Sequence, residues 1–139
     1  MSGARVPIYH QSEGSGEPLL LLNGIAMSAV SWDVVARPLA KSYRVIRCDF
    51  RGQLMTPEAP PGDIVEHADD VAALLDHLGV ERIHVIGTSF GGVVGTLLAA
   101  RYPDRVRSLT TIASASGFDE DLAVEVARWR AACVASLEG

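Results

Sequence analysis

A serine lies between glycines in the stretch VIGTSFGG, residues 85–92. The segment Gly87-Thr88-Ser89-Phe90-Gly91 matches the pattern G-x-S-x-G, in which a serine hydroxyl is held on a sharp turn between a strand and a helix. Apolar residues precede this segment, and a second apolar stretch follows it, as that context requires. Ser89 is therefore the candidate catalytic nucleophile.

The same turn supplies half of a candidate oxyanion hole. The N–H of Phe90, at the start of the following helix, can donate to an oxyanion, and the helix dipole favours negative charge there. Side chains at Gly87 and Gly91 would crowd the turn. We expect the second donor to be the N–H of Ile25, in the loop after an early apolar run, where Gly24 permits close approach.

Short apolar strands alternate with helices along the chain, which predicts an α/β protein with a mainly parallel sheet flanked by helices. Active sites in such sheets lie beyond the carboxyl ends of the strands, where the three glycine-containing turns of this chain fall. We predict strands at 6–10, 19–22, 43–48, 82–86 and 106–113, helices at 31–40, 68–78, 90–101 and 120–136, and a loop at 51–63.

Several stretches resemble the N-terminal half of α/β-hydrolase fold proteins, namely LLLLNG, YRVIRCDFRG, ADDVAALLDHLGVERIHVIGTSFGG and YPDRVRSLTTI. The resemblance runs from about residue 6 to 139 and is nearest to enol-lactonase and non-haem haloperoxidase-like members. It implies a truncated hydrolase core at 1–118 and the start of a cap or lid helix at 119–139. The implied function is serine hydrolysis of an ester, lactone or related acyl substrate.

The sequence departs from the family pattern in two loops. The family often has His-Gly where this chain has Asn23-Gly24, a change that leaves the backbone donor intact. It often has Arg-Gly-His-Gly where this chain has Arg51-Gly52-Gln53-Leu54, in a loop at the rim of the site. The second change therefore bears on substrate preference.

The family order also predicts an exposed strand. It implies the spatial sequence 6–10, 43–48, 19–22, 82–86 and 106–113, so the last strand would be an open edge beside a partly uncovered apolar face. Such edges and patches invite pairing with another chain. We therefore expect self-association, or binding of a complementary fragment, through the edge strand 106–113.

The triad acid and histidine are not in their expected places. In the family the triad runs in chain order serine, acid, histidine, and no histidine follows Ser89. Asp119 is a candidate acid, although the run Asp119-Glu120-Asp121 equally fits the negatively charged first turn of a helix. A serine hydroxyl without an adjacent base is a poor nucleophile, so we expect the isolated chain to be inactive.

The four histidines that precede Ser89 have ordinary structural interpretations. His84 lies inside a strand and is predicted to be a packed, hydrogen-bonded core residue. His77 ends a helix at the wrong edge of the sheet, and His10 lies on a peripheral strand. His67 begins a helix on the correct edge, but that helix packs outside the sheet. None is predicted to be the catalytic base.

Other reactive side chains near the turns are also given structural roles. Asp49 and Arg51 lie beside the site by topology, and we expect them to fix a loop. Cys48 and Cys133 are interpreted as apolar residues. No cluster has the spacing of metal ligands and no G-x-G-x-x-G follows a strand, so neither a metal nor a dinucleotide cofactor is predicted.

Composition narrows the classes of protein to which the chain can belong. The chain has 139 residues, 48% of them hydrophobic, and a net charge of −5, which fits one globular domain without a basic patch for nucleic acid or anionic membranes. Its apolar runs are too short to span a membrane, and its first 18 residues lack the apolar core of a secretory signal. Two distant cysteines favour a cytoplasmic location.

Two functions remain open from the sequence. The first is an ester or lactone hydrolase represented here by the half that carries Ser89, with the acid and histidine supplied downstream or by another chain. The second is a catalytically inactive half-domain that keeps the turn as a scaffold and serves binding or assembly. Reaction of Ser89 with an active-site probe separates them.

Overall fold

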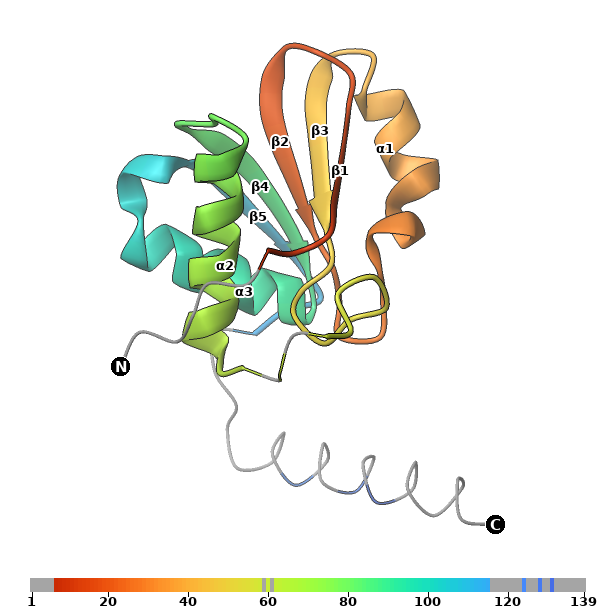
Figure 1. Cartoon of the computed structure of the whole chain (residues 1–139), viewed down its shortest axis with the longest axis vertical. Coiled ribbons are helices and arrows are strands. Elements are labelled where there is room, and N and C mark those ends of the chain that lie inside the picture. The colour runs from red at the N-terminus through yellow and green to blue at the C-terminus, as the bar shows by residue number, and fades with distance from the viewer. Residues whose placement is uncertain are drawn as a thin grey trace.

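The computed structural model describes residues 7–58, 60, 62–115, 124, 128 and 131. Helices and strands alternate along this part of the chain, as Figure 1 shows. In chain order the elements are β1 (His10–Glu13), β2 (Glu17–Leu22), the 3-10 helix η1 (Ala29–Trp32), α1 (Asp33–Leu39), β3 (Tyr43–Cys48), α2 (Ile64–His77), β4 (Ile83–Thr88), α3 (Phe90–Arg101), the 3-10 helix η2 (Pro103–Arg105) and β5 (Val106–Ile112).

The strands form one sheet in the order β1-β3-β2-β4-β5. Strand β1 runs antiparallel to β3, and the other three pairings are parallel. Helix α1 covers one face, and α2 and α3 cover the other (Figure 1). The predicted fold class and the predicted strand order are both confirmed, and the carboxyl ends of β2, β3 and β4 meet at one edge of the sheet.

Residues 19–22 of strand β2 are four buried leucines in a row. Leu20 and Leu22 belong to the core cluster beneath α2 and α3, while Leu19 and Leu21 pack with Trp32 on the opposite face. Successive side chains of a strand point to opposite faces, so a strand covered on both sides needs a continuous apolar run. The central strand is therefore buried between two helical layers.

Two predicted boundaries were wrong by several residues. The first strand was expected at 6–10, but β1 occupies 10–13, where the polar residues His10–Glu13 pair with the end of β3. An edge strand pairs with only one neighbouring strand and is less buried than a central strand. A run of apolar residues therefore does not identify it in the sequence. Helix α2 begins at Ile64 rather than Ala68, because Asp63 and Glu66 form a reciprocal capping box at its N-terminus.

The end of the chain carries predictions that the structure leaves untested. The expected helix at 120–136 lies outside the described residues except at 124, 128 and 131, each of which has helical backbone. Asp119, Cys133 and the division into 1–118 and 119–139 also fall outside the described part. They stay predictions.

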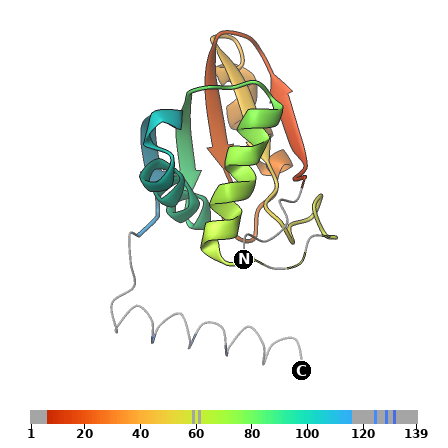
Figure 2. The ribbon, with the colours of Figure 1, turned by 60° about the vertical axis from the view of Figure 1, so that its left-hand side comes forward.

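Strand β5 is the last strand of the described sheet on its side (Figure 2). It pairs with β4 on one side, and no strand within residues 7–58 or 62–115 pairs with its other side. Arg107, Ser108, Thr110, Thr111 and Ile112 are all exposed. This is the open edge that the sequence predicts at 106–113.

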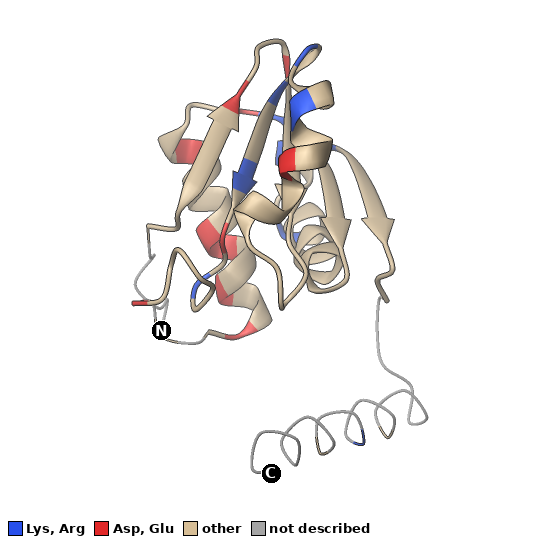
Figure 3. Ribbon diagram, turned by 90° about the vertical axis from the view of Figure 1, so that its right-hand side faces the viewer, with Lys and Arg blue, Asp and Glu red and all other residues tan. Residues whose placement is uncertain are grey.

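Charged residues of both signs are marked along the ribbon in Figure 3, with acidic residues recurring along α2 and basic residues on β3 and α1. None of the helices in the described segments is long and apolar enough to cross a bilayer.

Candidate active site

Ser89 is the only residue between the end of β4 and the start of α3. Its backbone angles are φ 49° and ψ −119°, outside the regions that residues with a side chain normally adopt, and its side chain is exposed. Such a conformation costs about 1–3 kcal/mol and persists only where neighbours impose it. Here the Ser89 N–H donates to the carbonyl of Ile112 at 2.8 Å, and the Ser89 carbonyl accepts from the N–H of Gly92 at 2.9 Å.

Two glycines make the turn sterically possible. A Cβ at Gly87 would collide with the carbonyl oxygen of Gly91. A Cβ at Gly91 would collide with the carbonyl of Leu22 and come within 2.5 Å of that of Asn23, so the first turn of α3 rests directly on the end of β2. The absence of side chains at both positions lets α3 start close enough to the sheet for Ser89 to project from its edge.

The loop after β2 lies against the serine. A Cβ built on Gly24 would lie 3.7 Å from the Cβ of Ser89, so a larger residue would fill the space beside the hydroxyl. Ile25 follows with 70% of its surface exposed. In the described part of the chain, neither the Ile25 N–H nor the Phe90 N–H donates to another loop, strand or helix. The oxyanion-hole role expected of these two N–H groups stays a prediction.

The side chain of Asn23 joins the loops that surround this point. Its Nδ2 donates to the carbonyl of Cys48 at 2.7 Å and also approaches Asp49 Oδ1 at 3.3 Å and Gln53 Oε1 at 3.2 Å. Its Oδ1 accepts from Trp32 Nε1 at 2.7 Å. Asn23 is completely buried, so these bonds meet the requirement that a buried amide be satisfied. The residue ties the end of β2 to the end of β3 and to η1.

Asp49, also completely buried, fixes two loops through its carboxylate. Oδ1 accepts from the N–H of Ala29 at 2.5 Å, and Oδ2 accepts from the N–H of Met55 at 2.9 Å. Hydrogen bonds from N–H groups to an ionised carboxylate are among the stronger ones in proteins. This is the loop-fixing role expected of Asp49.

Arg51 also fixes the loop after β3, through contacts with helix α2. Its guanidinium makes two bonds to Asp70, Nε to Oδ2 at 2.6 Å and Nη2 to Oδ1 at 2.8 Å, and Nη1 reaches Glu66 at 3.0 Å. These partners, the Asp70 hydrogen bond first, raise the pKa of Arg51 above its ordinary value despite burial. The arginine therefore fastens the loop after β3 to helix α2.

Residues 17–131 match the family described as alpha/beta hydrolase fold. This chain belongs to the α/β-hydrolase fold family. The resemblance seen in the sequence is thereby confirmed at the level of the family. In this family the turn between β4 and α3 that carries the serine is called the nucleophile elbow. Hydrolysis at the elbow serine needs a histidine within reach of its hydroxyl.

Relatives in the family align with most of this chain. A provisionally named carbamate hydrolase, RutD, of Azorhizobium caulinodans is 38% identical over 120 residues, which are 84% of this chain and 45% of that protein. The pimeloyl-[acyl-carrier protein] methyl ester esterase of Aliivibrio salmonicida is 32% identical over 111 residues, 80% of this chain and 41% of the esterase. The chain thus spans less than half the length of these relatives.

A solved structure shows the same arrangement. Est816, described as an N-acyl homoserine lactone degrading enzyme, superposes with a TM-score of 0.74 at 35% identity, over 77% of this chain and 42% of Est816. The hydrolases to which this chain is similar therefore cleave, by their names, a carbamate, a methyl ester and a lactone.

None of the four histidines of this α/β-hydrolase chain hydrogen-bonds to Ser89 within the described residues. His84 is hydrogen-bonded as predicted, through Nδ1 to Ser108 Oγ at 2.7 Å, but its side chain is 34% exposed, so the prediction of a core position was wrong.

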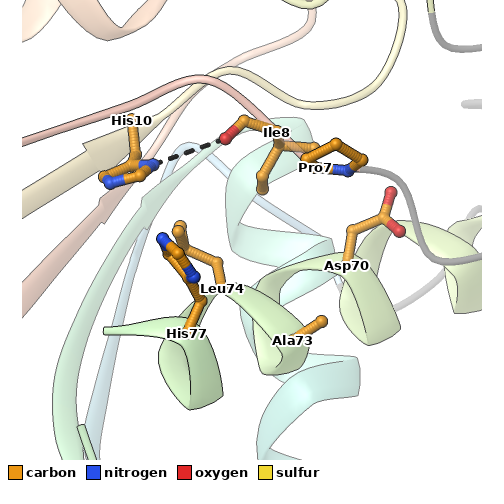
Figure 4. Close-up of a pocket in the computed structure, with 7 residues that line it drawn as sticks. All are labelled: Pro7, Ile8, His10, Asp70, Ala73, Leu74 and His77. Atoms are coloured by element: carbon orange, nitrogen blue, oxygen red, sulfur yellow. Dashed lines mark hydrogen bonds between the residues drawn. The ribbon is translucent and has the colours of Figure 1, made fainter. Parts of the chain in front are cut away.

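His10 and His77 face each other in a pocket between β1 and the end of α2 (Figure 4). Their ring centroids are 6.0 Å apart in an edge-to-face arrangement, and His10 Nδ1 lies 3.5 Å from the carbonyl of Ile8. The pocket of about 310 Å³ is also lined by Asp70 and Leu74 but not by Ser89. These two histidines contact one another and not the elbow.

His67 packs beneath the elbow, which the sequence analysis missed. Its ring lies edge-to-face against Phe90, with centroids 5.1 Å apart, and against Phe50 at 5.5 Å. Only 8% of the residue is exposed, and Nδ1 has no hydrogen-bond partner among the described residues. Burial, followed by the charge of Arg51, lowers the pKa of His67 below its ordinary value. It is a neutral aromatic support at neutral pH.

Gln53 is the other residue whose role the sequence did not reveal. Its Oε1 accepts from the N–H of Phe50 at 2.9 Å, and its Nε2 donates to the carbonyl of Gly24 at 2.9 Å. The departure from the family's Arg-Gly-His-Gly stretch therefore correctly indicated that this loop, which contains Gln53, lies at the site. It could not reveal the partner, because the loop containing Gln53 and the loop containing Gly24 are far apart in sequence.

Cysteine chemistry and metal binding find no support in the described segments. Cys48 is completely buried, and burial raises the pKa of its thiol to about 12, so the reactive thiolate is suppressed. Within those same segments, no group of three or more His, Cys, Asp and Glu side chains could hold a metal ion.

Proposed function

We propose that this chain carries the nucleophile and the oxyanion hole of a serine hydrolase that cleaves an ester, a lactone or a related acyl compound. The observation that supports it most is the exposed Ser89 at φ 49°, ψ −119° between β4 and α3, with Gly24 beside it. The relatives' names describe cleavage of bonds next to a carbonyl, which agrees with this reaction class.

The proposed reaction has two steps. Ser89 Oγ attacks the substrate carbonyl while a histidine takes its proton, and the negative oxygen is bound by the N–H groups of Ile25 and Phe90. The alkoxide leaves with the proton from the histidine, and water then cleaves the acyl-serine ester by the reverse transfers. The histidine and the acid come from sequence after Ser89 in a longer form of the protein, or from another chain. Asp119 is the acid candidate within this sequence.

A fluorophosphonate probe tests this proposal directly. The 139-residue chain alone should not be labelled, because no histidine is bonded to Ser89. A chimaera that joins residues 1–115 to the C-terminal remainder of Est816 should be labelled, and Ser89→Ala in the chimaera should abolish labelling. Lack of labelling in a folded chimaera would count against the nucleophile role. Labelling of the isolated chain would show that a base is already present.

A second candidate function is that of a binding or assembly module, and the exposed edge of β5 favours it. Residues 106–113 would then pair with a second copy or with a complementary fragment. Sedimentation at micromolar concentration should show an oligomer that Ile112→Lys weakens. Val34→Lys, which places the same charge on an exposed apolar residue of α1, serves as the control. A monomer at these concentrations contradicts self-association.

A further inference from the structure

The amide of Gln53 is held in one orientation by two pairs of partners. On one side, its Oε1 faces two donors, the N–H of Phe50 at 2.9 Å and Nδ2 of Asn23 at 3.2 Å. On the other side, its Nε2 faces two acceptors, the carbonyl of Gly24 at 2.9 Å and that of Ile25 at 3.4 Å. A flipped amide would place like groups against each other on both sides, so the network selects this orientation.

The bond from Gln53 to Gly24 has a consequence for the next residue. The carbonyl of Gly24 and the N–H of Ile25 belong to one peptide unit, which is planar and trans, so the oxygen and the N–H point in opposite directions. When Gln53 holds the oxygen, the direction of the Ile25 N–H is set as well. Accepting a hydrogen bond at the oxygen also polarises the peptide and strengthens its N–H as a donor.

Other restraints on this peptide are weak. Ile25 is 70% exposed, and the glycine before it has no side chain that would limit rotation. The N–H of Met27 donates to the same Gly24 oxygen at 3.1 Å, which closes a turn but shares that acceptor with Gln53. Gln53 is therefore the side chain that links this peptide to the body of the sheet.

We propose that Gln53 is a positioning residue that aims the Ile25 N–H at the space beside Ser89. The inference deepens the proposed function and rests on it for its catalytic meaning, because the N–H matters only if an oxyanion forms there. The fixed direction of the peptide can be measured without any reaction at Ser89.

Gln53→Glu is the most specific test of this role, because it changes the donor and little else. It keeps the shape of the side chain and an oxygen for the N–H of Phe50, but it replaces the Nε2 donor by a carboxylate oxygen that faces two carbonyls. Gln11→Glu makes the same change at the other glutamine of the chain, which donates to Tyr9 Oη at 2.8 Å from strand β1. It serves as the matched control. Thermal unfolding of each variant establishes that it is folded.

Nuclear magnetic resonance of the full 139-residue chain gives the first readout. In Gln53→Glu we expect the carbonyl carbon shift of Gly24 to move upfield, because the carbonyl loses the hydrogen bond from Gln53 and keeps only the one from the Met27 N–H. We also expect the amide order parameter of Ile25 to fall from about 0.85 to below about 0.6. Gln11→Glu should leave both unchanged. An Ile25 amide as ordered in Gln53→Glu as in the parent overturns the inference.

Fluorophosphonate labelling of the Est816 chimaera gives the second readout. Gln53→Glu should lower the labelling rate of Ser89 by about 10²-fold, comparable to removal of one oxyanion-hole donor. An unchanged rate beside a loosened Ile25 peptide overturns the positioning role and leaves Ser89 as the nucleophile. If Ser89 labels in no form, the proposed function fails, and the order parameter alone decides whether Gln53 fixes the peptide.

Discussion

On one side of the Ser89 hydroxyl, the turn from β4 to α3 is held by backbone contacts and by missing side chains. Gly87 and Gly91 leave room for carbonyl oxygens, and Ser89 itself is fixed through its own N–H and carbonyl. On the other side, the loop containing Gly24 is held by side chains from distant loops, with Gln53 bonded directly to its carbonyl. The first wall of the site, the turn from β4 to α3, is therefore fixed by backbone sterics. The second wall, the loop containing Gly24 with the side chains that hold it, is fixed by a hydrogen-bond network.

The two walls should respond differently to mutation. A steric arrangement tolerates no added atom, so even one methyl group forces the backbone to move. A hydrogen-bond network loses only the bonds of the residue that is changed, and its loss depends on which donor or acceptor is left unsatisfied. Substitutions in the turn should therefore change global stability most, and substitutions in the network should change it less.

Gly91→Ala should have the largest effect. The new Cβ meets the carbonyl of Leu22, which is backbone in the central strand and cannot rotate away. We expect the free energy of unfolding to fall by about 3 kcal/mol, the upper part of the range for overpacking. Urea denaturation measures it. Gly79→Ala is the control, since its Cβ meets no atom within 4 Å and only its φ of +64° is strained, which should cost about 1 kcal/mol.

This contrast also explains what could be predicted from the sequence. The fold class and the position of Ser89 between a strand and a helix follow from local patterns, because periodicity and glycine spacing report backbone geometry. The strand order was implied by the family resemblance, and the observed order agrees with it. The bonds from Asn23 to Cys48 and from Gln53 to Gly24 do not follow from local patterns, because they join residues 25 and 29 positions apart that only the folded sheet brings together. No histidine follows Ser89 in this sequence, so the sequence offered no triad histidine, and Asp119 stays the candidate acid.

Asp49→Asn should have an intermediate effect that is confined to the second wall. An amide can replace only one carboxylate oxygen as an acceptor, so its NH₂ group must face the N–H of either Ala29 or Met55. Leaving one buried N–H unsatisfied should lower the free energy of unfolding by about 1–3 kcal/mol. Chemical denaturation measures this loss. Asp104→Asn, at an exposed position, should change it by less than about 0.5 kcal/mol.

The smallest effect, and the one that links the two walls, concerns His67. Its ring supports Phe90 at the start of α3 and Phe50 in the loop after β3. Because burial lowers the pKa of His67 in the folded protein, the unfolded chain binds a proton more readily. Stability should therefore be complete above pH 6.5 and decrease as the pH falls below that value, until the folded protein is protonated as well.

His67→Phe separates this contribution from the rest of the acid response. The phenyl ring keeps the edge-to-face packing and removes the Nδ1 that has no partner among the described residues. Thermal unfolding between pH 7 and 5 should show a shallower loss of stability in the variant, by at most about 1.4 kcal/mol per pH unit for one proton. If the slope of His67→Phe equals that of the parent, protonation of His67 does not contribute to the loss of stability at acid pH.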